Sequence, residues 1–152
     1  MENKLDITAS IVLYKEDSTE LKRTVACFLK TTLTKKLFLV DNSPTDILKK
    51  EFNHPEIVYI FVGENKGFGK GHNVVIEKIK KQSAYHLVLN PDVVFQPQVI
   101  PNLIHTLERE SAVSLISPKV VYPNGDLQYT CRKYPTILGM LFRRTGVFKS
   151  VV

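Results

Sequence analysis

The triplet Asn90-Pro91-Asp92 directly follows the mostly apolar run 85–89, so a predicted strand ends at a carboxylate. Such a carboxylate either belongs to a surface turn or takes part in a site for a metal ion or a phosphate. Against a diphosphate, each like-charge pair costs roughly 3 kcal/mol at ~5 Å and an effective dielectric near 20. A Mg²⁺ or Mn²⁺ ion between the two groups reverses the sign of that interaction. The triplet therefore predicts either a turn or a divalent-metal site at Asp92, to which Asn90 adds a neutral oxygen or a contact to a sugar or water.

A glycine-rich loop follows the third apolar run of the chain and precedes a helical pattern. Closely spaced glycines let backbone N–H groups approach an anion, and the start of a helix adds positive potential. The loop has no Gly-Lys-Ser/Thr sequence of a Walker A loop, and it is not a dinucleotide fingerprint after the first strand. It is therefore either a flexible connection or a phosphate cradle. Its residues of interest are Gly67, Gly69 and Gly71, the lysines Lys66 and Lys70, and the flanking Asn65 and Asn73, which either close the loop or contact a ribose.

A second carboxylate, Asp41, follows the short apolar run 37–40. A continuous apolar run of this length is typical of a strand that is covered on both faces. Asp41 either accepts a hydrogen bond from the ring N–H of a pyrimidine base or begins an ordinary Asp-Asn-Ser-Pro turn. Both interpretations stay open on the residues alone.

Strand-like and helix-like patterns alternate along the chain, which predicts an α/β fold with an open, mostly parallel sheet and helices on both faces. The capping pair Asp17 and Glu20 marks the start of the first helix. Strands are expected at 7–14, 37–40, 57–62 and 85–89, with shorter candidates at 113–116 and 119–122 and a turn at 123–126. Helices are expected at 18–31, near 46–52, at 74–81, from Pro97 onward and at 136–144.

In such a sheet, ligands bind beyond the carboxyl ends of the strands, where the strand order reverses. Asp41 and Asp92 each follow a predicted strand directly, so both are expected at this edge. The sequence therefore predicts that the two carboxylates and the glycine-rich loop contribute to one ligand site.

The composition limits the classes of protein. At 152 residues the chain has the length of a single domain, 1–152, and no apolar run approaches the ~18 residues of a membrane span. The first ten residues do not resemble a signal peptide, which favours a cytoplasmic protein. Two distant cysteines predict neither a disulfide framework nor a zinc site. The net charge of +6 suits nucleic acid, an anionic membrane surface or a phosphate-rich small molecule, but no basic, aromatic stripe favours nucleic acid.

Five motifs in order resemble the family 2 glycosyltransferases, and among them the bacterial rhamnosyltransferase-like members most. The motifs are SIVLY, LFLVDNSPTD, VGENKGFGKGHNVVI, LVLNPDV and SPKVVYPNGDLQYTCRKYPT, so the resemblance covers about 6–144. It implies a Rossmann-like GT-A fold, a UDP- or dTDP-sugar donor, a divalent metal, and transfer to a saccharide or lipid-linked acceptor in the synthesis of bacterial cell-surface polysaccharide.

The resemblance also implies roles for individual residues. Asp41 would read the uracil or thymine ring and Tyr14 would lie beside the base. Asp92 would be the metal ligand, with Asn90 in place of the first aspartate of the family's D-x-D motif. The ribose and diphosphate pocket would be shaped by Asn65, Gly67, Gly71 and Asn73.

The family's catalytic base is a carboxylate of an acidic pair in the acceptor half, which the resemblance places beyond Val152. The pair Glu16-Asp17 lies after the first strand and is interpreted as a helix cap. The expected function is therefore the donor half of a glycosyltransferase. The alternative is a catalytically incomplete nucleotide-sugar-binding or interaction module, whose apolar residues Leu138, Met140, Leu141 and Phe142 would mediate self-association or contact with the inner membrane surface.

Overall fold

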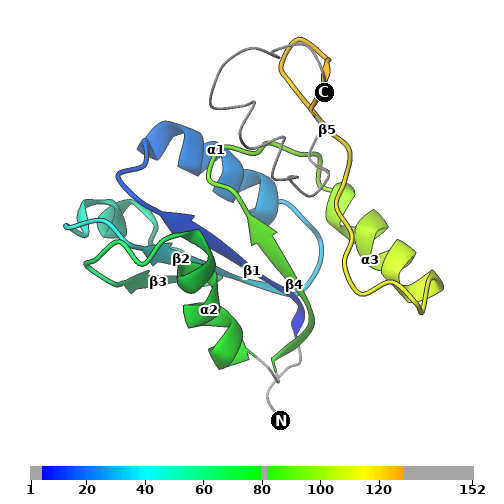
Figure 1. The fold of residues 1–152 in the computed structure, drawn as a ribbon, viewed down its shortest axis with the longest axis horizontal. Helices are drawn as coiled ribbons and strands as arrows, with labels where there is room; N and C mark the ends of the chain where they lie inside the picture. The colour runs from blue at the N-terminus through cyan, green and yellow to red at the C-terminus, as the bar shows by residue number, and fades with distance from the viewer. Residues whose placement is uncertain (1–4, 80–81, 129–152) are drawn as a thin grey trace, which may run out of the picture. The chain divides into compact units, whose positions relative to one another are not determined.

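Four parallel strands form one sheet in the computed structural model of the chain, which describes residues 5–79 and 82–128 (Figure 1). The strands pair in the order β3-β2-β1-β4. Their bounds are Leu5–Leu13 for β1, Lys35–Asp41 for β2, Ile57–Phe61 for β3 and Ser83–Leu89 for β4. The predicted parallel α/β sheet is confirmed.

The order of the strands reverses at β1. From β1 the chain adds β2 and then β3 on one side, and β4 afterwards pairs with the free side of β1. In the register of the sheet, Leu13 pairs with Asp41 and Ile11 pairs with Leu89, so the carboxyl ends of the strands lie at a common edge. This switch point between β1 and β4 is the place where doubly wound sheets bind their ligands.

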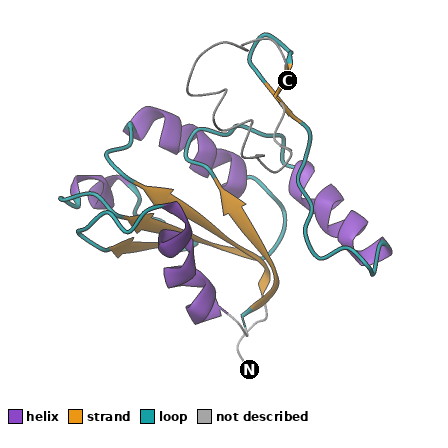
Figure 2. Ribbon diagram, in the orientation of Figure 1, coloured by secondary structure: helices purple, strands orange, loops and turns teal. Residues whose placement is uncertain are grey.

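Helices cover both faces of the sheet (Figure 2). On one face, α1 (Ser18–Leu29) and α3 (Val99–Arg109) pack against alternate residues of the strands. The resulting apolar cluster includes Ile11 and Leu39 from the strands and Phe28 from α1. On the other face α2 (Phe68–Ile79) packs through Val75 and Ile79 against Val12, Phe38 and Val40. Successive residues of β1 and β2 thus serve opposite faces, as the period of two in a strand requires.

The first helix begins where the sequence predicts. The carboxylate of Asp17 accepts hydrogen bonds from the backbone N–H groups of Thr19 and Glu20, at 2.7 and 3.3 Å, and so caps α1. A short 3₁₀ helix at Ile47–Glu51 occupies the segment expected to be helical near 46–52.

The second helix begins earlier than predicted, at Phe68 instead of residue 74. The low helix propensity of glycine favours a loop in this segment, but close packing of α2 on β1 stabilises the helix. A Cβ on Gly71 would lie 2.7 Å from both methyl groups of Val12. The absence of a side chain at Gly71 therefore lets α2 approach β1 closely.

Two expectations after α3 have different outcomes. Residues 113–116 are not a strand, whereas Val120–Val121 (β5) pairs antiparallel with Leu127–Gln128 (β6) across the predicted turn, in which Gly125 has a φ of +89°. The expected helix 136–144, with Leu138, Met140, Leu141 and Phe142, lies outside the described residues. The chain divides into two compact units, Met1–Ile116 and Ser117–Val152, and the four-stranded sheet belongs to the first. None of the helices described is long and apolar enough to cross a membrane.

Candidate functional site

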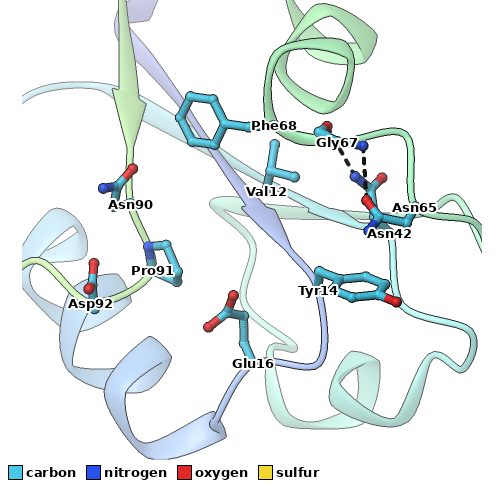
Figure 3. A pocket seen from close by; sticks show the side chains of 10 residues that line it. All are labelled: Val12, Tyr14, Glu16, Asn42, Asn65, Gly67, Phe68, Asn90, Pro91 and Asp92. Atoms are coloured by element: carbon cyan, nitrogen blue, oxygen red, sulfur yellow. Dashed lines mark hydrogen bonds between the residues drawn. The ribbon is translucent and has the colours of Figure 1, made fainter. Parts of the chain in front are cut away.

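A pocket with a volume of about 390 Å³ opens at the carboxyl edge of the sheet (Figure 3). Its walls come from the carboxyl ends of the strands, the loops that follow them and the start of α2. The lining residues are Val12 in β1, Tyr14 and Glu16 after β1, Asn42 after β2, Asn65 and Gly67 after β3, Phe68 at the start of α2, and Asn90, Pro91 and Asp92 after β4. The pocket therefore lies at the switch point of the sheet.

The structure brings most of the predicted site residues together. Tyr14, Asn65, Gly67, Asn90 and Asp92 all line this pocket. The other three predicted residues, Asp41, Gly71 and Asn73, do not line it: Asp41 and Gly71 are buried, and Asn73 is exposed on α2.

Asp41 is held in the body of the protein. Its side chain is 1% exposed, Oδ1 accepts a hydrogen bond from the backbone N–H of Ser43 at 2.8 Å, and Oδ2 accepts one from the hydroxyl of Tyr59. Burial and this bond to the carboxylate raise the pKa of the Tyr59 phenol well above its usual range. The structure therefore shows Asp41 stabilising the turn after β2 and does not place it in the pocket.

The next residue, Asn42, takes the place in the lining that the sequence analysis gave to Asp41. Its Nδ2 donates to the carbonyl of Gly67 at 3.3 Å, and its backbone N–H donates to the carbonyl of Leu13 at 2.9 Å. Asn42 is 1% exposed, yet its Oδ1 accepts no hydrogen bond from any residue that the structure describes. A buried acceptor without a partner costs about 1–3 kcal/mol, so this oxygen favours a ligand that can donate a hydrogen bond.

The strand period could have identified Asn42 in the sequence. Leu37 and Leu39 face the α1 side of the sheet and Phe38 and Val40 face the α2 side. If the alternation continues beyond Val40, Asp41 faces the α1 side and Asn42 faces the α2 side.

The glycine-rich loop closes on itself through Asn65, one of the two predicted roles for that residue. Oδ1 of Asn65 accepts the backbone N–H of Gly67 at 2.9 Å. Gly67 has a φ of +75°, which side chains of L-residues disfavour, and its carbonyl accepts the backbone N–H of Gly71 in the first turn of α2. The loop thus delivers the N-terminus of α2 to the pocket.

Glu16 also lines the pocket, although the sequence analysis assigned it to a helix cap. Asp17 alone makes the capping bonds described above, while Lys15 adopts a left-handed φ of +57° and donates its backbone N–H to Oγ of Ser43 at 2.8 Å. Burial raises the pKa of Glu16, a backbone hydrogen bond at Tyr14 lowers it, and the charge of Asp92 raises it further. Glu16 and Asp92 thus both line this pocket, from the loops after β1 and β4.

Comparison with known proteins identifies the family. The family model for glycosyl transferase family 2 matches residues 8–149. The chain belongs to glycosyl transferase family 2.

One curated protein and one solved structure are similar to this chain. The chain is 29% identical over 150 residues to the low-salt glycan biosynthesis hexosyltransferase Agl10 of Haloferax volcanii, a match that covers 96% of this chain and 46% of Agl10. The crystal structure of S. aureus TarS 1–349 superimposes with a TM-score of 0.51 at 14% identity, covering 70% of this chain and 33% of TarS. The likeness to TarS shows the GT-A fold, and the chain spans about half the length of Agl10.

The pocket of this glycosyltransferase chain fits a divalent cation. Asp92 and Glu16 offer carboxylate oxygens and Asn90 offers an amide oxygen, which are the ligands that Mg²⁺ and Mn²⁺ prefer. Within residues 5–79 and 82–128, no group of three or more His, Cys, Asp or Glu side chains could hold a metal ion by itself. A cation here would therefore take its remaining ligands from a bound phosphate or from water.

Proposed function

We propose that the chain is the donor-binding half of a glycosyltransferase, which binds a UDP- or dTDP-sugar together with Mg²⁺ or Mn²⁺. The observation that carries this proposal is the composition of the pocket at the switch point. An unsatisfied acceptor, Oδ1 of Asn42, belongs to one wall and the carboxylate of Asp92 belongs to the other.

The pocket offers a distinct partner for each part of such a donor. Tyr14 presents an aromatic face for the pyrimidine ring, and Asn42 offers an acceptor for its ring N–H. The glycine-rich loop and the N-terminus of α2 suit the ribose and the diphosphate. Asp92, with Asn90 beside it, holds the cation that screens the diphosphate from the carboxylate.

Transfer requires that the acceptor hydroxyl attack the anomeric carbon while negative charge builds up on the departing diphosphate. When bound, the cation supplies the electrostatic stabilisation of that charge. We assign no catalytic base among the residues of the pocket. General-base catalysis typically contributes ~10²–10⁴-fold, so we expect slow transfer from this chain by itself.

The donor and acceptor classes are also part of this proposal. Agl10 is named a hexosyltransferase of glycan biosynthesis. We extend that class to this chain, with a hexose such as rhamnose as the sugar and a saccharide or lipid-linked acceptor of bacterial cell-surface polysaccharide at the cytoplasmic face of the membrane.

Titration calorimetry tests donor binding directly. With Mn²⁺ present, we expect saturable heat with UDP or dTDP, and a loss of about tenfold or more in nucleotide affinity for Asp92→Asn. Asp46→Asn is the matched control, because Asp46 is exposed and does not line the pocket. Absence of heat with both nucleotides, or equal affinities for the two variants, would contradict the proposal.

A further inference from the structure

Two carboxylates reach the pocket from strands that are neighbours in the sheet but distant in the sequence. Glu16 lies in the loop after β1 and Asp92 lies after β4 (Figure 3). In this view the two side chains flank Pro91.

The charged side chains that line the pocket are both negative, and the ammonium of Lys15 lies outside the lining, 5.4 Å from the ring of Tyr14. Among the residues that the structure describes, neither Lys, Arg nor His lines the pocket, although the whole chain carries a net charge of +6. Lys66 in the adjacent loop pairs with Glu64 at 3.2 Å. The pocket therefore repels a bare diphosphate and attracts a cation.

A buried polar group in the same pocket supports the presence of a ligand there. Asn42, 1% exposed, lines the same pocket with its Oδ1 unpaired among the described residues. Its Nδ2 bond to the carbonyl of Gly67 fixes which end of the amide is the oxygen. The two carboxylates thus share a pocket with a buried polar group that still lacks its partner.

Backbone contacts fix the two loops that carry these carboxylates. Glu16 lies between Lys15, in its left-handed turn, and Asp17, the N-cap of α1. The same helix fixes the other side, because Oγ1 of Thr24 donates to the carbonyl of Pro91 at 2.7 Å. Helix α1 therefore connects the loop of Glu16, through the Asp17 cap, to the loop of Asp92, through Thr24.

We infer that Glu16 is the second carboxylate of the cation site, and that the protein holds Mn²⁺ or Mg²⁺ between Glu16 and Asp92 before the nucleotide arrives. This inference rests on the proposed function and adds a residue to its site. Glu16 supplies the carboxylate that the triplet Asn90-Pro91-Asp92 lacks at its first position. The consequence is a cation site that forms without the diphosphate.

The experiment measures Mn²⁺ binding to the full chain without nucleotide, by the electron paramagnetic resonance signal of free Mn²⁺. Loss of even an outer partner of a metal typically costs 10–100-fold in affinity. We therefore expect Glu16→Gln and Asp92→Asn each to weaken Mn²⁺ binding by about tenfold or more. Glu20→Gln is the matched control: it makes the same change four residues away, at an exposed glutamate that pairs with Arg23.

Two outcomes overturn the inference. The first is a wild-type chain that does not bind Mn²⁺ without nucleotide, and the second is a Glu16→Gln variant that binds Mn²⁺ as tightly as Glu20→Gln. Circular dichroism spectra of the variants that match the wild type exclude a loss of fold as the cause of weaker binding.

Nucleotide titration at saturating Mn²⁺ separates this inference from the proposed function. If the wild type binds UDP or dTDP and Glu16→Gln leaves Mn²⁺ affinity unchanged, the role of Glu16 fails and the proposed function stands. If the wild type binds neither nucleotide, the proposed function fails whatever the effect at Glu16.

Discussion

The two faces of the central strand β1 differ in how they are stabilised. Toward α1 and α3, β1 presents Ile7, Ala9, Ile11 and Leu13, all buried in one apolar cluster. Toward α2 it presents Thr8 and Ser10, both 0% exposed, before Val12. The first face of β1 depends on close packing, whereas the second combines the packing of Val12 against α2 with buried hydrogen bonds.

The hydrogen bonds of the second face form a continuous chain. Ser83 donates to the carbonyl of Tyr85 at 2.8 Å, and Thr8 shares hydrogen bonds with Ser83 and with Nδ1 of His86, each at 2.9 Å. Ser10 in turn shares hydrogen bonds with Nε2 of His86 at 2.8 Å and with Nδ1 of His72 at 2.7 Å.

One atom at the end of this chain has no partner. Nε2 of His72 is buried without a hydrogen bond to any residue described. The comparison shows that an apolar pattern in the sequence predicts a packed face. A buried polar face is harder to predict, because its hydrogen bonds join residues that are distant in the sequence.

We expect the largest effect on stability from a cavity in the apolar face of β1. Phe28 is 0% exposed in the cluster beneath β1, and Phe28→Ala leaves a large cavity there. We expect a loss of about 3–5 kcal/mol in the free energy of unfolding, measured by urea denaturation. The exposed Phe61→Ala is the control, with a much smaller loss. Equal losses for the two variants would show that packing on this face is not the main source of stability.

A smaller effect tests how closely α2 packs on the other face. The Cβ of Gly71→Ala would lie 2.7 Å from the Val12 methyl groups, so we expect a loss of about 1–3 kcal/mol in the free energy of unfolding. Gly69→Ala is the matched control. A Cβ there meets nothing within 4 Å, and alanine favours a helix over glycine by roughly 0.5–1 kcal/mol.

The double variant Gly71→Ala/Val12→Ala sharpens this test. Removal of the Val12 methyl groups should recover part of the loss if the clash causes it. If the loss in the free energy of unfolding in the double variant exceeded the sum of the losses in the two single variants, a direct contact between these residues would be contradicted.

The smallest effect concerns the pH dependence of the polar face. Burial, and then the nearby His72, lower the pKa of His86 to about 4, against an ordinary value near 6.5 in the unfolded chain. Between these values the unfolded chain binds more protons than the folded chain, so stability should fall as the pH is lowered from about 6.5 to 4 and then level off for this group.

Urea denaturation at pH 7 and pH 5 measures this dependence. His86→Gln should reduce the difference in the free energy of unfolding between the two pH values, whereas His105→Gln, at an exposed position on α3, should leave the difference as in the wild type. An unchanged difference in His86→Gln would assign the pH dependence to other groups.

The predictions made from the sequence succeeded where neighbouring residues decide the structure. The alternation of apolar runs predicted the parallel sheet, and the pair Asp17 and Glu20 predicted the start of α1. The start of α2 was wrong by six residues, because the close contact of Gly71 with Val12 involves a strand that lies far away in the sequence. The same reason explains the omission of Glu16, which lies next to a helix cap in the sequence and opposite Asp92 in space.

The sequence by itself determined the family, the type of sheet and the presence of polar residues after its strands, because periodicity and motif spacing are local properties of the chain. Only the tertiary structure decided which of these residues share a pocket. It brought Asn42 to the carbonyl of Gly67 and Asp41 to the hydroxyl of Tyr59, because both partners belong to segments further along the chain that meet these residues only in the fold. It also brought Glu16 beside Asp92, because the strands β1 and β4 pair in parallel and end at the same edge.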